Sequence, residues 1–339
     1  MTSSSVSTTA DPLPGYDDVV AASERLAGLA VKTPLLESPQ LNALAGGRIL
    51  IKPEVLQRTG SFKFRGAFNR ISTLPEEARR NGIIAYSSGN HAQGVAAAAQ
   101  LQGIAATIVM PADAPRIKVE NTRSYGAEVI LYDRYHEVRE DVTARLREER
   151  GSTLVKPYDD PFVIAGQGTC GLEIARQAEA MGAELDAVLI CCGGGGLSAG
   201  SALALRRLSP HTDIYTVEPE GFDDTARSIE AGERVANPAG GGSICDALLA
   251  PTPGELTFTL NKDLLSGGLA VSDDEVTTAM RTAFQMLKLV VEPGGAVALA
   301  AVLSGKLDLA GRTVAVVLSG GNVDAETFCR LVTGKGGTG

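Results

Sequence analysis

This sequence of 339 residues lacks an excess of basic side chains. Its 40 Asp and Glu residues outnumber its 31 Lys and Arg residues, so the formal net charge is −9. A protein that binds nucleic acid needs a basic surface to neutralise phosphates. The acidic balance therefore excludes nucleic acid from the expected partners.

Long apolar runs and targeting signals are lacking as well. No run reaches the roughly 18 apolar residues that a membrane span requires, so no membrane partner is expected. Residues 1–15 contain neither Lys nor Arg and no apolar core, unlike a secretory signal. We expect residues 1–15 and 331–339 to form disordered tails.

Cysteines are few, and none of them forms a C-x-x-C pair. Their scattered positions exclude a disulfide framework and a zinc site: Cys170, Cys191, Cys192, Cys245 and Cys329. Cys191 and Cys192 close an apolar run and should behave as small buried hydrophobes. This usage predicts a reducing compartment, hence the cytoplasm.

What the sequence does have is a regular alternation of short apolar runs and helical segments. Six runs are continuous and apolar rather than alternating, which predicts buried parallel strands. They cover residues 83–86, 106–110, 127–132, 187–192, 213–218 and 313–319. The longest predicted helix covers about 272–290 and begins at an N-cap, Ser272. The pattern predicts an α/β fold with doubly wound sheets.

The strands fall into two groups, which predicts two lobes with an active cleft between them. We expect a large domain built from residues 16–82 and 156–330. A small domain is expected from residues 83–155.

A glycine loop, Gly193–Gly196, lies between a predicted strand and the helical segment LSAGSALALRRL. In this arrangement backbone N–H groups and the helix dipole can hold a phosphate. Polyglycine linkers usually lie between polar segments, so phosphate binding is favoured over a flexible connector.

Three further motifs are ambiguous when each is taken alone. Ser87–Gly94 open a helix and suit a carboxylate, although ordinary capping by Ser88 or Asn90 is the favoured interpretation when this motif is taken alone. Ser319–Asn322 follow a strand and suit either a cofactor edge or a simple turn. Lys63 lies between two phenylalanines, where partial desolvation would make it a nucleophile; the alternative is a surface lysine.

Together, the segments SFKFRG, SSGNH, GGGGL and SGGN, in this order, resemble the pyridoxal-phosphate-dependent enzymes of fold type II. Within that superfamily the sequence is similar to the threonine/serine dehydratases and the related serine racemases. The resemblance covers about residues 16–330. It implies two doubly wound lobes of tryptophan-synthase-β-like architecture and pyridoxal phosphate as cofactor.

The resemblance also implies a role for each motif residue. Lys63 would hold the cofactor as a Schiff base and take the substrate's Cα proton, Asn90 would bind the cofactor's 3-hydroxyl, and Ser319 would face its pyridine nitrogen. Backbone N–H groups would bind its phosphate: those of Gly193, Gly194, Gly195, Gly196 and Leu197. The substrate carboxylate would be bound by Ser87, Ser88 and His91, with Ser88 as a second catalytic proton-transfer group.

The segment VEPEGFDD matches a stretch that binds a divalent cation in these relatives. Its ligands here would be Glu218, Asp224 and the Phe222 carbonyl. Such oxygen donors suit Mg²⁺, with Ca²⁺ or Mn²⁺ as alternatives. The other interpretation of this segment is a solvated acidic loop.

The resemblance implies β-elimination from L-threonine or L-serine to a 2-oxo acid and ammonia. A serine, rather than a carboxylate, at the pyridine nitrogen suits elimination better than transamination. The alternatives are a serine racemase, a 3-hydroxyaspartate dehydratase of the same family, and a non-enzymatic binding module. A homodimer is expected, as is a catabolic role without an effector domain, since the chain ends soon after SGGN.

Substrate choice is weakly encoded in the sequence. A second carboxylate would need a cation, and Arg139 in EVRED falls where a relative has an arginine near the site, with Arg134 close by. An exposed, charged helix is the interpretation favoured for both arginines. Ala247 follows Asp246 where relatives have glycine, a departure that puts the identity of the substrate in doubt.

Overall fold

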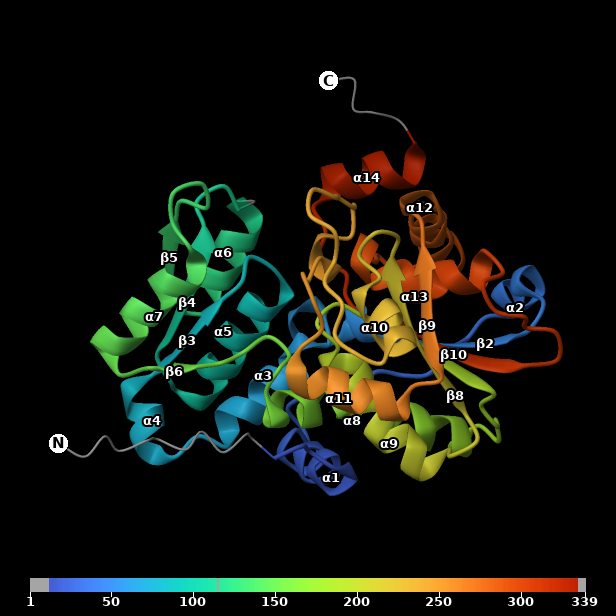
Figure 1. The fold of residues 1–339 in the computed structure, drawn as a ribbon. Helices are drawn as coiled ribbons and strands as arrows, with labels where there is room; N and C mark the ends of the chain where they lie inside the picture. The colour runs from blue at the N-terminus through green and yellow to red at the C-terminus, as the bar shows by residue number, and fades with distance from the viewer. Residues whose placement is uncertain (1–11, 115, 335–339) are drawn as a thin grey trace.

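The computed structural model describes residues 12–114 and 116–334, which form two separate β-sheets surrounded by helices (Figure 1). The larger sheet has the strand order β1-β2-β10-β7-β8-β9 and the smaller has the order β5-β4-β3-β6. Neighbouring strands are parallel except β1 and β2. The predicted α/β fold with two doubly wound sheets is confirmed.

The larger sheet consists of β1 (Leu36–Glu37), β2 (Arg48–Pro53), β7 (Ala187–Cys191), β8 (Asp213–Pro219), β9 (Gly267–Val271) and β10 (Thr313–Leu318). The smaller sheet consists of β3 (Ile83–Tyr86), β4 (Ala106–Pro111), β5 (Glu128–Tyr132) and β6 (Thr153–Leu154). All strands of the smaller sheet therefore lie within the predicted small domain. The domain boundaries themselves remain a prediction.

Helices cover both faces of each sheet. Those of the larger lobe are α1 (Tyr16–Arg25), α2 (Pro39–Ala45), α3 (Lys63–Ser72), α8 (Pro161–Ala180), α9 (Gly196–Leu208), α10 (Asp224–Ala231), α11 (Glu255–Leu264), α12 (Asp273–Thr282), α13 (Pro293–Leu303) and α14 (Ala325–Thr333). Those of the smaller lobe are α4 (Glu76–Asn81), α5 (Asn90–Gln102), α6 (Arg116–Ser124) and α7 (Arg139–Arg150). Short helical turns cover Glu54–Leu56, Arg58–Gly60 and Asp246–Leu248.

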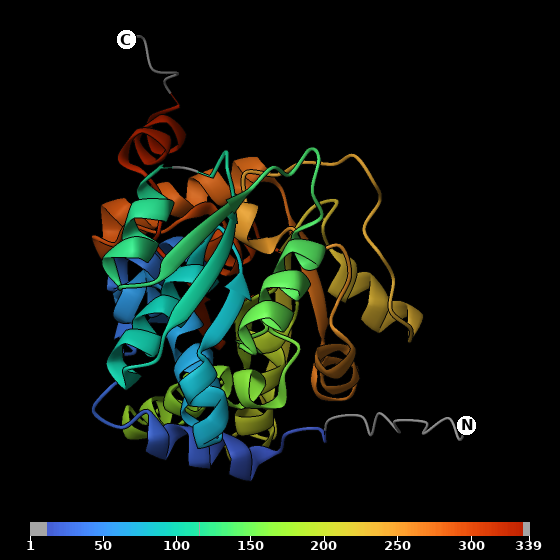
Figure 2. The ribbon, with the colours of Figure 1, turned by 90° about the vertical axis from the view of Figure 1, so that its left-hand side faces the viewer.

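Successive side chains of a strand point to opposite faces, and this alternation builds two cores on the larger sheet. Leu189 and Val316 pack with α12 and α13 on one face. Val188 and Val317 pack with α8 and α9 on the other. In the smaller sheet, α5 covers one face and α7 the other (Figure 2). The carboxyl ends of buried parallel strands are thus left as the open edge where ligands bind.

The structure corrects several predicted boundaries. The helix expected over about 272–290 is α-helical only to Thr282, and a π-helical segment, Ala283–Leu287, follows it. Ser272 caps it as predicted, with its hydroxyl accepting from the Glu275 N–H. Helix α14 continues to Thr333, so residues 331–333 are helical and the prediction of a disordered tail is wrong for them. Residues 1–11 and 335–339 of the expected tails lie outside the described residues.

Two full strands were not predicted from the sequence. β2 contains Arg48 and Lys52, which break the apolar pattern, and β9 begins with two glycines. Both pair with neighbouring strands through backbone hydrogen bonds, and both add buried apolar residues to the core, Ile49, Leu50 and Ile51 from β2 and Val271 from β9.

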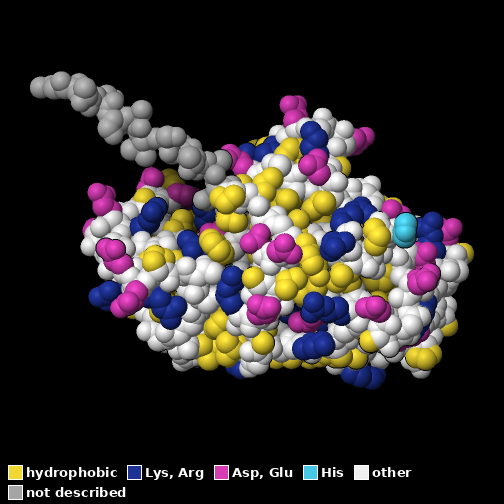
Figure 3. Space-filling model, turned by 90° about the horizontal axis from the view of Figure 1, so that it is seen from below, with side chains coloured by type: hydrophobic (Ala, Val, Ile, Leu, Met, Phe, Trp, Pro, Cys, Tyr) yellow, Lys and Arg dark blue, Asp and Glu magenta, His cyan; other side chains and the backbone are white. Residues whose placement is uncertain are grey.

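On the face drawn in Figure 3, acidic and basic side chains are interspersed, with hydrophobic ones between them. Within residues 12–114 and 116–334, no helix combines the length and apolar character that a bilayer crossing demands.

Candidate active site

Three of the four sequence motifs are in direct contact, and the fourth, the glycine loop, packs against Tyr158, the neighbour of the Pro157 carbonyl that accepts from Lys63. A β-bridge joins Ser61 to Gly320, and the Phe62 N–H donates to the Ser319 carbonyl at 3.1 Å. The Asn322 side chain donates to Asn90 Oδ1 at 2.7 Å. The segments around Lys63, Ser87–Gly94 and Ser319–Asn322 are therefore in direct contact. Asn322 also donates to the Thr59 carbonyl, 263 positions away in the chain.

Lys63 is the first residue of α3 and is partly buried. Its Nζ donates to the Pro157 carbonyl at 2.9 Å and lies 5.1 Å from the centre of the Phe62 ring. Burial lowers the pKa of Lys63 to about 8. A lysine with a lowered pKa is more often neutral and hence more nucleophilic, as predicted for a Schiff-base lysine.

Ser87–Gly94, the carboxylate motif, lead into α5, but no side chain of the described residues caps this helix. The N-cap is Gly89, and neither Ser88 nor Asn90 provides the capping bond that the alternative interpretation requires. The first N–H groups of a helix have no partner within it. Together with the partly buried Ser87 and Ser88, they remain suited to a substrate carboxylate.

Asn90 is held from both sides by residues far away in sequence. Its Nδ2 donates to Glu292 Oε1, and its Oδ1 accepts from Asn322. Burial raises the pKa of Glu292 to about 7. A side chain on Gly320 would collide with Glu292, because its Cβ would lie 2.1 Å from Oε1. Glu292 was not predicted as a site residue, and no local motif marks it.

His91 is buried, and its Nε2 lies 2.9 Å from the Val155 carbonyl. A carbonyl only accepts, so this contact assigns the proton to Nε2 and leaves Nδ1 as an acceptor. Burial, with a smaller contribution from Lys63, lowers the pKa of His91 to about 3. A neutral His91 with this tautomer cannot donate to a carboxylate, which argues against direct substrate binding by its ring.

The glycine loop connects β7 to α9 through conformations that only small residues allow. Gly195 has φ of +88°, and a Cβ on Gly194 would lie 2.3 Å from the Tyr158 ring. Thr257 Oγ1 donates to the Gly194 carbonyl at 2.7 Å. The uncapped N-terminus of α9 adjoins the loop, as phosphate binding requires.

Ser319 directly follows β10 and is 4 % exposed, with its hydroxyl beside the Cys191 thiol. A glycine loop, an amide fixed at Asn90 and a hydroxyl at Ser319 match the phosphate, 3-hydroxyl and ring nitrogen of pyridoxal phosphate. The residues present therefore fit that cofactor.

The segment predicted to bind a cation forms a buried acidic pair. Glu218 accepts from the N–H groups of Thr225 and Ala226 at 3.0 and 2.8 Å. Burial raises the pKa of Glu218 to about 8 and that of Asp224 to about 6. Asp224 Oδ2 is buried and has no hydrogen-bond partner among residues 12–114 and 116–334. Among the residues that the structure describes, no group of three or more His, Cys, Asp or Glu could hold a metal.

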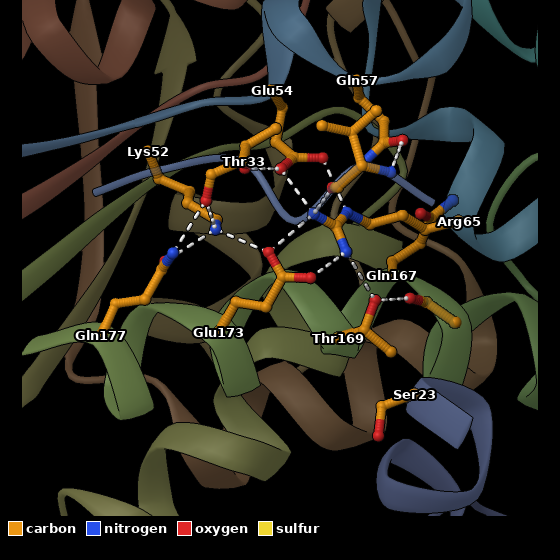
Figure 4. Close-up of polar contacts among 12 residues, drawn as sticks. Ser23, Thr33, Lys52, Glu54, Gln57, Arg65, Gln167, Thr169, Glu173 and Gln177 are labelled. Carbon is orange, nitrogen blue, oxygen red and sulfur yellow. Dashed lines mark hydrogen bonds and ion pairs between the residues drawn. The ribbon is translucent and has the colours of Figure 1, made fainter. Parts of the chain in front are cut away.

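A buried ionic network surrounds Arg65, two residues after Lys63 in the chain, and was not predicted (Figure 4). Arg65 pairs with Glu54 and Glu173, both at 2.7 Å, and Lys52 pairs with Glu173 at 2.6 Å. The network ties β2, the helix α3 that begins at Lys63, and α8 together.

The two arginines considered for substrate choice differ. Arg134 precedes α7 and pairs with Asp113 at 2.8 Å. Arg139 begins α7, and its guanidinium carbon lies 5.0 Å from the centre of the Tyr86 ring. Tyr86 directly precedes Ser87 in the chain. Half of the Arg139 side chain is exposed.

The departure at Ala247 causes no backbone strain. Within residues 12–114 and 116–334, only Thr59 and Lys288 among non-glycine residues have positive φ. Asp246 pairs with Lys118 of α6 at 2.7 Å, beside a cavity of about 290 Å³ that Glu292 and Asn322 also line.

Comparisons with known proteins agree with this geometry. The family described as "Pyridoxal-phosphate dependent enzyme" matches residues 26–320. An L-threo-3-hydroxyaspartate ammonia-lyase of a Pseudomonas species is 45 % identical over 324 residues, 95 % of this chain and 99 % of that protein. A serine racemase of Schizosaccharomyces pombe is 41 % identical, over 95 % of this chain and 98 % of that protein.

Solved structures show the same fold. A threonine deaminase from T.th. has a TM-score of 0.86 and 47 % identity, covering 92 % of this chain and 99 % of that one. Because the family match spans most of the chain, and Lys63, Asn90, the glycine loop and Ser319 fit its cofactor, this chain belongs to the pyridoxal-phosphate-dependent enzymes.

Proposed function

We propose that this protein is a pyridoxal-phosphate-dependent ammonia-lyase that converts β-hydroxy amino acids, L-threonine or L-serine among them, to a 2-oxo acid and ammonia. The observation that carries the proposal is Lys63, whose pKa is lowered to about 8 where three of the four motifs are in direct contact. When bound, the cofactor supplies the electron sink for the negative charge that develops at Cα.

The chain's own residues hold the substrate and move its protons. The N-terminus of α5, with Ser87 and Ser88, binds the α-carboxylate. Lys63 removes the Cα proton, since an amine with a pKa near the working pH is an efficient base. Asn90, fixed by Glu292 and Asn322, orients the cofactor. The proton taken from Cα and the departing β-hydroxyl together make one water molecule, and hydrolysis of the released enamine gives the 2-oxo acid and ammonia.

A second candidate substrate is L-threo-3-hydroxyaspartate. The ammonia-lyases for this compound from the Pseudomonas species and Saccharomyces cerevisiae are 45 % and 44 % identical to this chain. Arg139, stacked over Tyr86 beside Ser87, provides the cation that a second carboxylate needs. This contact favours a substrate-binding role for Arg139 over the alternative that it is only an exposed helix residue.

The experiment is 2-oxo acid release from L-threonine, L-serine, D-serine and the 3-hydroxyaspartate isomers, with pyridoxal phosphate and Mg²⁺ present. Turnover of threonine and serine supports the first substrate, and turnover restricted to hydroxyaspartate supports the second. Interconversion of L- and D-serine without 2-oxo acid would identify a racemase instead. A protein that stays colourless after cofactor addition would contradict every one of these activities.

We also propose a divalent cation at Glu218, Asp224 and the Phe222 carbonyl, with Mg²⁺ favoured over Ca²⁺ and Mn²⁺. Two buried carboxyls and the unpartnered Asp224 Oδ2 support it, because a cation would compensate their burial. With only two carboxylates, water molecules would complete the coordination shell.

Chelation tests this cation site. We expect Mg²⁺ to raise the melting temperature of the native chain and of Glu220→Gln, an exposed control two residues away, but not that of Glu218→Gln. A chelator should lower activity without removing the cofactor from Lys63. If chelation changes neither activity nor melting temperature, the cation site does not exist.

A homodimer and a cytoplasmic location complete the proposal. Free, buried cysteines at positions 170, 191, 192 and 245 are compatible with a reducing compartment. Sedimentation of the holoenzyme would measure the oligomeric state.

A further inference from the structure

Three polar side chains adjoin Ser87 or the Pro157 carbonyl, and each has hydrogen-bonding groups that the described part of the chain leaves unused. Tyr86 directly precedes Ser87, and Tyr158 directly follows Pro157, whose carbonyl accepts from Lys63. Arg139 lies over the Tyr86 ring. We call Tyr86, Arg139 and Tyr158 the distal wall. It is built from both lobes, because Tyr86 ends β3 of the smaller sheet while Tyr158 leads into α8.

Arg139 has donors to spare. Its Nε donates to Glu140 Oε1 at 2.6 Å. Among the described residues, its Nη atoms make no hydrogen bond, and its guanidinium plane is held by the Tyr86 ring. A guanidinium with free Nη atoms presents a fork that matches a carboxylate.

Tyr158 is held firmly, but only through its ring. The ring lies against Gly194 so closely that a Cβ there would come within 2.3 Å of it. The phenol oxygen makes no hydrogen bond to any residue within the described part of the chain. Burial raises the pKa of Tyr158, and the charge of Arg139 only partly offsets this. The hydroxyl therefore stays protonated and is available as a donor.

A wall with a guanidinium and available phenol hydroxyls is suited to an anion. The methyl group of threonine would leave these donors unpaired, whereas a second carboxylate would accept from them. Sites that hydrogen-bond a substrate group discriminate strongly against analogues without it. Such a wall therefore favours the second candidate substrate, a β-hydroxy amino acid that carries a second carboxylate.

We propose that the Tyr158 hydroxyl is a specificity-determining group that donates a hydrogen bond to the second carboxylate of a dicarboxylic β-hydroxy amino acid, beside Arg139. The inference rests on the proposed ammonia-lyase function. With Arg139 alone, only the small lobe would contact the second carboxylate. With Tyr158, the large lobe contacts it as well.

The test is Tyr158→Phe, which keeps the ring on Gly194 and removes only the hydroxyl. We expect kcat/KM for 3-hydroxyaspartate to fall about 10- to 100-fold, the effect of losing one hydrogen bond to a charged group. For L-serine, kcat/KM should stay unchanged. Tyr135→Phe, at an 80 % exposed position, is the matched control and should change neither value. An equal loss for both substrates, or no loss for either, would overturn the proposal.

Ligand binding gives a readout that does not depend on elimination. L-aspartate keeps both carboxylates but lacks the leaving hydroxyl, and L-alanine lacks the second carboxylate. We expect Tyr158→Phe holoenzyme to bind L-aspartate more weakly, as followed by cofactor absorbance, and L-alanine as before. A wild-type enzyme that binds L-aspartate no better than L-alanine would refute the inference. Failure to eliminate any hydroxy amino acid would refute the proposed function instead, while this binding comparison would still decide the role of Tyr158.

Discussion

Burial sets the protonation state of each titratable side chain around Lys63. It lowers the pKa of Lys63 to about 8 and that of His91 to about 3, and it raises the pKa of Glu292 to about 7. In each case the charged form loses hydration that the protein does not fully replace. The site therefore holds a reactive amine beside a histidine that remains neutral.

Lys63→Ala removes this amine. We expect turnover to fall by at least about 10²- to 10⁴-fold, the usual contribution of a positioned base. The absorbance of the lysine-bound cofactor should disappear, while circular dichroism stays unchanged. Lys156→Ala, at a neighbouring exposed position, serves as the control. If Lys63→Ala turned over substrate as fast as wild type, Lys63 would not be the catalytic base.

His91 should make stability depend on pH. Its pKa falls from 6.5 to about 3 on folding, so between these values the unfolded chain binds a proton that the native chain does not. The free energy of unfolding should therefore rise with pH over this window, by at most about 1.4 kcal/mol per pH unit from this group. Urea unfolding from pH 3 to pH 7 measures it.

His91→Gln keeps a donor for the Val155 carbonyl and removes the titration. Its pH slope should be shallower than that of wild type, whereas His211→Gln, at an exposed position, should leave the slope unchanged. Equal slopes in wild type and His91→Gln would show that His91 titrates normally.

At the scale of elements, glycines allow α8 and α9 to approach each other closely. A Cβ on Gly200 of α9 would lie 2.1 Å from the Ile164 carbonyl and 2.6 Å from the Gly168 nitrogen of α8. The helix pair in turn supports the glycine loop at the start of α9. Backbone contact without side chains thus positions the phosphate-binding residues.

Gly200→Ala should lower stability by about 1–3 kcal/mol, because overpacking forces the two helices apart. Thermal or urea unfolding of the holoenzyme measures this loss. Gly242→Ala, where a Cβ would meet nothing within 4 Å, should have no measurable effect. Equal stability of the two variants would mean that α8 and α9 separate at little cost.

At the scale of the whole molecule, the buried ionic network connects segments far apart in the chain. Glu54 accepts from Arg65 at 2.7 and 2.8 Å and from Thr33 at 2.7 Å. Burial acts to raise the pKa of Glu54, but the charges of Arg65 and Lys52 and the hydrogen bonds from Arg65 and Thr33 together outweigh it, so the pKa is lowered and the carboxyl remains ionised. The network fixes the start of α3 and hence the position of Lys63.

Glu54→Gln leaves a buried guanidinium with too little negative charge around it. We expect a loss of about 3–5 kcal/mol in the free energy of unfolding, as for one broken partner of a buried ion pair. Glu76→Gln breaks an exposed pair with Arg80 and should change stability little. A Glu54→Gln enzyme as stable as wild type would show that Glu173 alone compensates Arg65.

Much of this architecture was determined by the sequence itself. The apolar run 83–86 became β3 with unchanged bounds, and Ser272 caps α12 as expected. Such features depend on neighbouring residues, which propensity and capping rules describe. The order of the lysine, carboxylate, glycine-loop and SGGN motifs likewise sufficed to identify the family and the cofactor.

Only the tertiary structure decided what depends on distant partners. Lys52 reads as a polar break in an apolar strand, yet it is fully buried against Glu173. Glu292 holds Asn90 across 202 positions of the chain. Burial and pairing over such separations arise from packing, so no local pattern in the sequence indicates them. The same holds for the contact of the Tyr158 ring with Gly194, because these two residues are also far apart in the chain.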